Sequence, residues 1–236
     1  MNCERVQDCD GCGSRRGSYI RIREQSGKKR HMGKIYCVMG KSSSGKDSIY
    51  HEILSRSELS LKRIVPYTTR PIREGEIPGR EYHFCDEATV QRLTDEGRII
   101  ELRSYMTVHG EWKYFTVDDG QIDLLQHDYL YIVTLEGYKK IVEYFGKEHV
   151  EPIYIYVEDG ERLMRALSRE RQQKEPKYAE LCRRFLADSA DFSEENCKDA
   201  GIDRRFENKD LEKTIQEITE FIQSDSKEEA DGYKSK

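Results

Sequence analysis

The feature that most constrains the fold of this chain is a glycine-rich stretch between an apolar run and a helical pattern. It contains Gly40, Gly45 and Lys46 at the spacing G-x-x-x-x-G-K. Glycines let the backbone turn so that successive N–H groups point at one anion, and the following helix adds its positive N-terminal end. The lysine then reaches the outer phosphates of a nucleotide. An ordinary connecting loop is the alternative, but the order of strand, loop and helix favours a phosphate-binding loop. We expect its ligand-binding residues to be Gly40, Ser42, Ser43, Ser44, Gly45, Lys46, Asp47 and Ser48.

The residue after the lysine departs from the general motif, which has Ser or Thr there for Mg²⁺. This chain has Asp47 at that position, and its nearest hydroxyl follows at Ser48. We expect Mg²⁺ to be held with the nucleotide by Ser48 or Asp47, mostly through water. Asp47 has a second interpretation, because an acidic residue in the first turn of a helix stabilises the N-terminus.

Length and composition restrict the class of protein. The 236 residues suit one globular domain, and the formal net charge of −5 argues against a general nucleic-acid binder. No apolar run approaches the ~18 residues of a membrane span, so we expect no membrane partner and a cytoplasmic location. Residues 1–32 are locally basic and residues 224–236 are charged, which predicts a disordered extension and a disordered tail. Cys9 and Cys12 have a spacing that metal sites use, but free thiols are the better interpretation.

Apolar runs alternate with helical patterns through the rest of the chain. The mostly apolar segments are typical of parallel strands that are covered on both faces. Strands are expected at 34–39, 61–66, 98–102, 113–117, 128–135, 151–157 and 202–208. Helices are expected at 44–57, 86–97, 137–146, 159–173 and 210–222, with another through Arg183 and Arg184.

The stretch 67–84 is rich in arginine, glutamate, proline and glycine. A solvated loop is the simplest interpretation of such a run. Against it, Arg70 and Arg73 with Tyr82 make a good anion clamp, because guanidinium offers a planar fork of donors that matches phosphate oxygens. Glu76 is placed to hold these arginines.

The spacing of Thr68, Thr69, Arg70, Arg73, Glu76, Gly79, Tyr82 and Phe84 resembles the signature of the guanylate kinase family. Members of that family transfer a phosphoryl group from ATP to GMP. The resemblance covers about residues 33–223 and implies a P-loop α/β fold in three layers around a five-stranded parallel sheet. It also implies a small mixed α/β insert that binds GMP, at about 66–117, and a helical lid over ATP, at about 159–183.

The resemblance adds residues to the expected GMP site. It implies that Glu101 grips the guanine, which suits the chemistry, because a carboxylate accepts from the adjacent N1–H and N2–H₂ donors that adenine lacks. It implies that Tyr114 binds the GMP phosphate, that Thr116 contacts the base and that Glu136 supplies a carboxylate, with Thr134 where the family has a second one. Without the family, Glu101 reads as a surface residue on an edge strand.

The resemblance also assigns residues on the ATP side. Arg165, Arg169 and Arg184 match the arginines of the lid and of the following helix, and with Lys46 they are the expected catalytic residues. Asn208 matches an asparagine beside the adenine pocket. A charged, exposed helix face is the alternative for these arginines. It is the better interpretation for Arg162 and Arg171, and the choice of Arg169 over Arg171 stays open.

The resulting hypothesis is an ATP-dependent guanylate kinase, a monomer or homodimer whose partners are ATP and GMP. One alternative is a non-catalytic interaction module of the guanylate-kinase-like type, which would lack a working phosphate loop. The other is a P-loop kinase of another small phosphorylated acceptor. It is suggested by Pro66, Phe115 and Thr134, which depart from the family pattern around the GMP site.

Overall fold

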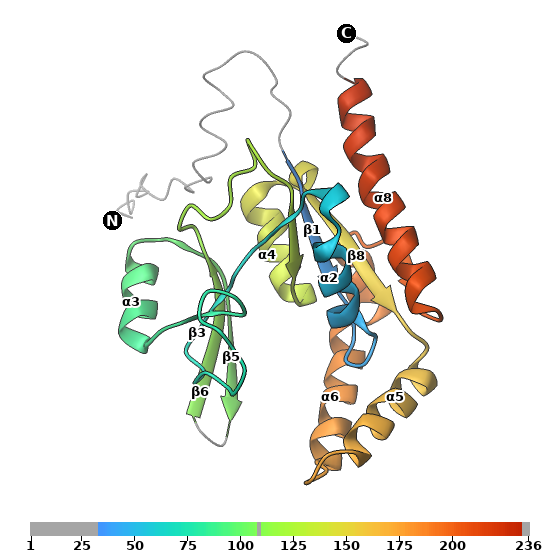
Figure 1. Cartoon of the computed structure of the whole chain (residues 1–236). Helices are drawn as coiled ribbons and strands as arrows, with labels where there is room; N and C mark the ends of the chain where they lie inside the picture. The colour runs from blue at the N-terminus through green and yellow to red at the C-terminus, as the bar shows by residue number, and fades with distance from the viewer. Residues whose placement is uncertain (1–32, 108–109, 233–236) are drawn as a thin grey trace, which may run out of the picture. The chain divides into compact units, whose positions relative to one another are not determined.

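The computed structural model describes residues 33–107 and 110–232 (Figure 1). The extension expected over residues 1–32, with its cysteines, therefore lies outside the described residues. Two sheets organise the described part of the chain.

The larger sheet has five strands, all parallel, in the order β2-β7-β1-β8-β9. The central strand β1 (Ile35–Met39) is buried along its whole length, as its continuous apolar run predicts. The expected central parallel sheet is confirmed. The other strands are β2 (Lys62–Arg63), β7 (Tyr129–Ile132), β8 (Val150–Tyr156) and β9 (Arg205–Glu207).

Helices cover both faces of this sheet, which gives the three layers (Figure 1). Successive side chains of a strand point to opposite faces. Tyr36 and Val38 of β1 pack in one core cluster with α2 (Lys46–Ser55) and α8 (Leu211–Gly232). On the other face lies α4 (Leu135–Phe145), whose buried residues include Tyr138 and Ile141.

The last helix is longer than the sequence predicts. We expected it to end near Ile222 and to be followed by a disordered tail over 224–236, but α8 continues to Gly232. Asp225 explains part of this difference, because it accepts hydrogen bonds from Lys34 Nζ at 3.2 Å and from the Tyr36 hydroxyl at 2.9 Å. These bonds tie the helix to the start of β1 across a long sequence separation.

The second sheet is mixed, in the order β4-β3-β6-β5, and forms the insert. The helix α3 (Glu87–Asp95) packs on it through a small core that includes Val90, Leu93 and Phe115. Asp86 caps this helix by accepting from the Thr89 amide, as expected of an N-cap residue. The strands are β3 (Tyr67–Thr68), β4 (His83–Phe84), β5 (Ile99–Thr107) and β6 (Gly110–Val117).

The region that we expect to form a lid consists of two helices, α5 (Asp159–Arg171) and α6 (Tyr178–Asp191), which contact each other; we call them the lid helices. A short helix that we did not expect, α7 (Glu194–Asp199), follows and is capped by Ser193. Single 3₁₀ turns lie at Ser57–Leu59 and Lys147–His149. Among the described residues, no helix is both long and apolar enough to span a membrane.

Candidate active site

The glycine-rich loop connects β1 to α2, as the sequence predicts. Gly45 ends the loop with φ of 84°, in the left-handed region that glycine adopts without strain. A side chain there would also collide with Asn208, because a Cβ atom would lie 2.5 Å from its amide nitrogen. The first amides of α2 have no partner within the helix, so the end of the loop offers a set of N–H donors to an anion.

Asn208 holds the loop from the other side. It follows β9 and is buried, and its Nδ2 donates to the Ser44 carbonyl at 2.8 Å. The backbone carbonyl of Asn208 accepts from Arg165 Nη2 at 3.1 Å. The structure therefore links Asn208 directly to the glycine-rich loop, and within the described part of the chain Arg165 is connected to the loop through Asn208.

Ser43 is unusual in the loop, since its φ of 63° is left-handed although it is not glycine. Such a conformation costs of order 1 kcal/mol for a residue with a Cβ atom. Its hydroxyl accepts a hydrogen bond from Arg169 Nη2 at 3.3 Å. The side chain of Ser43 thus connects the strained point of the loop to an arginine of α5.

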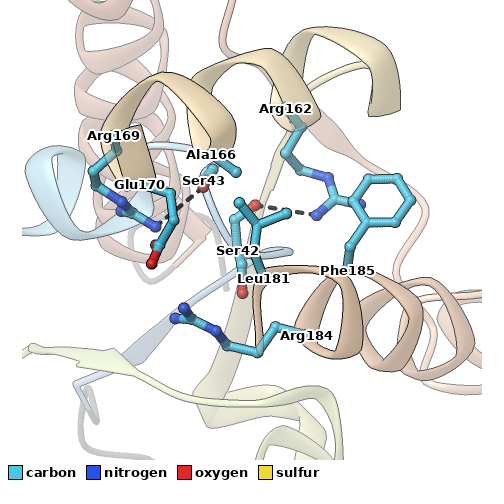
Figure 2. Close-up of a pocket in the computed structure, with 9 residues that line it drawn as sticks. All are labelled: Ser42, Ser43, Arg162, Ala166, Arg169, Glu170, Leu181, Arg184 and Phe185. Carbon is cyan, nitrogen blue, oxygen red and sulfur yellow. Dashed lines mark hydrogen bonds between the residues drawn. The ribbon is translucent and has the colours of Figure 1, made fainter. Parts of the chain in front are cut away.

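Two lid arginines meet the loop in one pocket. Arg169 and Arg184 line it together with Ser42 and Ser43 (Figure 2). The pocket as it stands has room for about one water molecule, but it shows that guanidinium groups from both α5 and α6 converge on the loop, an arrangement that suits the stabilisation of a transferring phosphoryl group.

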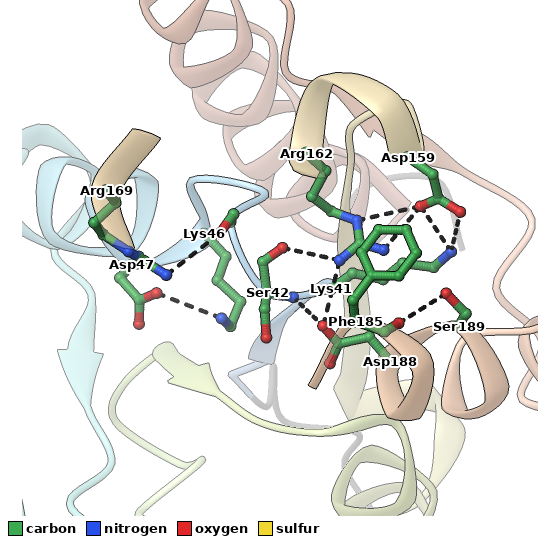
Figure 3. A network of polar contacts seen from close by, with 11 residues as sticks. Lys41, Ser42, Lys46, Asp47, Asp159, Arg162, Arg169, Phe185, Asp188 and Ser189 are labelled. Atoms are coloured by element: carbon green, nitrogen blue, oxygen red, sulfur yellow. Dashed lines mark hydrogen bonds and ion pairs between the residues drawn. The ribbon is translucent and has the colours of Figure 1, made fainter. Parts of the chain in front are cut away.

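The loop is also fastened to the lid helices by a buried arginine (Figure 3). Arg162 Nη1 donates to the Ser42 carbonyl at 3.1 Å, and the guanidinium stacks on Phe185 at 4.3 Å. Arg162 pairs with Asp159 at 2.9 Å and with Asp188 at 3.4 Å. We expected Arg162 to lie on an exposed helix face. That was wrong, because it is only 1% exposed.

Asp188 and Lys41 complete this network. Asp188 Oδ2 accepts from the Ser42 amide at 2.7 Å, so both backbone groups of Ser42 are bound by the lid helices. Lys41 Nζ pairs with Asp159 at 3.2 Å. The two positive charges of this network, on Lys41 and Arg162, are offset by the two aspartates. The uncompensated N–H donors and the lysine at the end of the loop, Gly45 and Lys46, are therefore the better place for an anion.

Lys46 and Asp47 are the first two residues of α2, and their charged groups lie 3.4 Å apart. Both Asp47 and Ser48 are exposed, and their side chains leave the helix about 100° apart. No group of three or more acidic, histidine or cysteine side chains that could hold a metal occurs among the described residues. Mg²⁺ commonly takes only one or two carboxylates and fills its remaining positions with water and phosphates. Asp47 fits that role, and it lies beside Lys46.

In the insert, the structure brings together Arg70, Glu76 and Tyr82 of the expected anion clamp, but not the side chain of Arg73. Arg70 is 3% exposed and forms a bidentate salt bridge with Glu76. Its Nη1 donates to Oε2 at 2.9 Å and its Nη2 donates to Oε1 at 2.7 Å. The guanidinium lies over the Tyr82 ring at 5.2 Å, and that ring contacts Tyr114 edge-on at 5.7 Å. Glu76 also accepts from the Arg73 amide at 2.7 Å, while the Arg73 side chain is exposed. Hydrogen bonding to Arg70 lowers the pKa of Glu76, so the carboxylate stays charged.

Glu101 is buried, at 4% exposed, so the interpretation as a surface residue on an edge strand was wrong. It lies on the edge strand β5, but α4 packs against that strand and covers it. Thr116 donates to its Oε1 at 2.8 Å, and the Tyr131 hydroxyl lies 2.7 Å from the same threonine. The structure thus brings Glu101 and Thr116 together, as the predicted base pocket requires.

Arg103 is the main residue of this pocket that sequence reasoning missed. Its Nε and Nη2 donate to the two oxygens of Glu101, at 2.9 Å and 3.3 Å, and its Nη1 donates to Thr134 Oγ1 at 3.3 Å. Burial has the largest single effect on the pKa of Arg103 and lowers it, but the charge and hydrogen bonding of Glu101, together with Tyr131 and Tyr105, raise the pKa overall. The spacing of two residues along a strand was the available signal, because it puts Glu101 and Arg103 on one face.

Thr134 and Glu136 follow β7, at the carboxyl end of the parallel sheet. Thr134 caps α4 by accepting from the Gly137 amide, while Glu136 lies exposed in the first turn of that helix. Glu136 is therefore beside the site but outside the buried hydrogen-bond network of Glu101. Asp188 was missed with Arg103, and no local pattern in the sequence indicated its contact with the loop.

Comparisons with known proteins agree with this geometry. A family model described as guanylate kinase matches residues 32–225. A guanylate kinase of Anaplasma phagocytophilum is 27% identical over 200 residues, which cover 83% of this chain and 89% of that protein. A guanylate kinase of Bordetella pertussis is 32% identical over 127 residues, covering 53% and 55%.

A shorter sequence match and a match to a solved structure are also guanylate kinases. A guanylate kinase of Chromobacterium violaceum is 39% identical, but only over 70 residues, so the match spans 30% of this chain and a third of that relative. The crystal structure of the guanylate kinase from Anaplasma phagocytophilum superimposes with a TM-score of 0.58 at 22% identity. It covers 82% of this chain and 86% of that one, and it supports the fold.

Proposed function

This chain belongs to the guanylate kinase family, and from that premise we propose that it transfers the terminal phosphoryl group of ATP to GMP, giving ADP and GDP. The observation that carries the proposal is the combination of two sites within one fold. One is a phosphate-binding loop that faces lid arginines. The other is an insert that joins an arginine anion clamp to a buried carboxylate able to recognise guanine.

On the ATP side, the loop amides and Lys46 hold the phosphates. Arg169 and Arg184 reach the transferring group, because they already share a pocket with Ser42 and Ser43. Arg165 contributes by fixing Asn208, whose amide supports the loop. These roles suit phosphoryl transfer, which depends mainly on positioning and charge neutralisation.

On the GMP side, Arg70, Arg73, Tyr82 and Tyr114 bind the phosphate, and Glu76 keeps Arg70 in place. Glu101 and Thr116 bind the guanine. Closure of the region 159–183 over the insert 66–117 excludes water, so that GMP and not water receives the phosphoryl group.

The residues around Lys46 fit a magnesium ion bound with ATP. Asp47 would hold it directly or through water, and the ion would neutralise charge on the outer phosphates when bound. Ser48 is the second candidate ligand, from the next position of α2.

A second candidate function is a kinase of another small phosphorylated acceptor. The Arg103–Glu101 pair favours it, because it leaves the base-recognition carboxylate already satisfied in the free protein.

A coupled assay of ADP release separates the two functions. The purified protein is given MgATP with GMP, AMP, IMP, UMP or phosphorylated sugars in turn. We expect GMP to have the highest kcat/KM, and Lys46→Met to abolish the activity. A preference for any other acceptor would refute the assignment of GMP and favour the second function.

A further inference from the structure

The two donors of Arg103 reproduce the recognition edge of guanine. In a guanidinium, Nε and Nη2 are N–H groups on nitrogens bonded to one carbon. In guanine, N1–H and the amino group at N2 are likewise donors on nitrogens bonded to one carbon. Both edges can therefore donate two parallel hydrogen bonds to a carboxylate. In this chain the guanidinium makes both bonds, to the two oxygens of Glu101 at 2.9 Å and 3.3 Å.

The remaining contacts leave Glu101 little room for a second partner. Its Oε1 also accepts from Thr116 Oγ1 at 2.8 Å, and the carboxylate is almost fully removed from solvent, with its side chain 1% exposed. Gly137 lies near another side of the carboxylate, since a Cβ atom there would be in van der Waals contact with Oε2, at 3.6 Å. A guanine base cannot take both bonds to this carboxylate while Arg103 keeps them.

From these contacts we infer that Arg103 is an internal ligand of the base-recognition carboxylate, which GMP must displace before Glu101 can read its guanine. The inference rests on the proposed function, since it names the residue that competes with the substrate at that same site. It also gives Arg103 a role that the second candidate function does not require.

The surroundings of Arg103 allow such an exchange. Its side chain is 14% exposed and that of Glu101 is 1% exposed, so Arg103 lies nearer to solvent than the carboxylate it binds. On β6 its cross-strand partner is Tyr114, one of the proposed phosphate-binding residues. The displaced guanidinium can therefore leave toward solvent and the acceptor phosphate without any change in the backbone pairing of β5.

Competition of this kind has a measurable consequence. The apparent dissociation constant of a ligand equals its intrinsic value divided by the fraction of protein in the competent state. If Arg103 occupies Glu101 in nine molecules of ten or more, GMP binds at least about tenfold more weakly than it would to an open pocket. Removal of the guanidinium should therefore strengthen the binding of GMP.

The experiment is titration calorimetry of GMP, without ATP, on the full chain and on Arg103→Met, which keeps an apolar stem but no donors. We expect GMP to bind the variant at least about tenfold more tightly. IMP should gain by the same factor, because the cost of opening the pocket does not depend on the ligand. Arg92→Met is the control, since Arg92 forms an exposed pair with Glu96 in the same insert and its loss should change nothing.

Unchanged or weaker binding of GMP to Arg103→Met would overturn the inference. If the variant does not fold, the side-chain Nε–H resonance of Arg103 in the unaltered protein gives the answer, with Arg103→Lys used for assignment. Saturation with GMP should shift that resonance strongly and AMP should not, and a resonance that GMP leaves in place would contradict the inference. Phosphorylation of GMP by the unaltered protein is measured alongside, so that loss of the proposed function is distinguished from loss of this inference alone.

Discussion

Arg162→Met tests whether the lid helices hold the phosphate-binding loop in its shape. The guanidinium is buried and bonded to the Ser42 carbonyl and two aspartates, so its removal breaks a buried ion-pair network. Breaking such a pair costs ~3–5 kcal/mol when both partners are buried. Asp159 is 45% exposed and retains water, and Asp188 keeps its bond to the Ser42 amide, so the loss is reduced. We expect a decrease of ~2–4 kcal/mol in the free energy of unfolding.

Urea unfolding and a titration with ATP measure the two consequences of this change. The affinity for ATP should fall about tenfold, since a difference of ~1.4 kcal/mol in loop ordering is a factor of ten in binding. Arg171→Met is the matched control, because Arg171 lies on the same helix and is exposed. Ordinary surface substitutions change the free energy of unfolding by less than ~0.5 kcal/mol. If Arg162→Met lowered the free energy of unfolding by no more than this and left ATP binding unchanged, the loop would not be held by Arg162.

Three further predictions concern the two substrate sites. Glu101→Gln should raise the KM for GMP at least tenfold and reduce selectivity over IMP, because one acceptor of the pair becomes a donor; a large change in ATP affinity would show that Glu101 has been misplaced. Ser43→Gly should raise the thermal midpoint of unfolding, because glycine adopts the positive φ without strain. The kcat should fall, because Arg169 loses its hydrogen-bond partner. A rise in kcat would argue against the positioning of Arg169 by Ser43. Because Arg70 lowers the pKa of Glu76, the stability from their pair should be complete above about pH 4.3 and should decrease as the pH falls through the lowered pKa. Unfolding by urea at pH 6 and pH 3.5 should show this loss, and an equal loss in Glu76→Gln would assign it to other groups.

The sequence predicted those parts of the fold and of the site whose residues lie close together along the chain. The loop is one example, because the positive φ of Gly45 and the first turn of α2 follow from a few adjacent residues. The clamp is another, since Arg70, Glu76 and Tyr82 meet within a short segment of the insert. In both places a pattern of residue types determines the geometry directly.

The parts that sequence did not predict depend on contacts between distant segments. Glu101 is buried because α4 covers the edge strand β5. The alternation of polar and apolar residues along β5 does not indicate that a helix covers it. Arg162 is buried by Phe185 of the next helix, although its own helix is mostly charged. Part of the extra length of α8 is explained by Asp225, which contacts Lys34 and Tyr36 at the distant start of the central sheet.

The central claim is that ATP and GMP are converted to ADP and GDP at this site. Phosphorus-31 NMR of the protein with MgATP and GMP tests it most directly, because it identifies both products in one sample. We predict that the β-phosphate signals of ADP and GDP rise together in equal amounts, and that neither appears with Lys46→Met. Formation of ADP with inorganic phosphate, or of ADP only when another acceptor is supplied, would contradict the account.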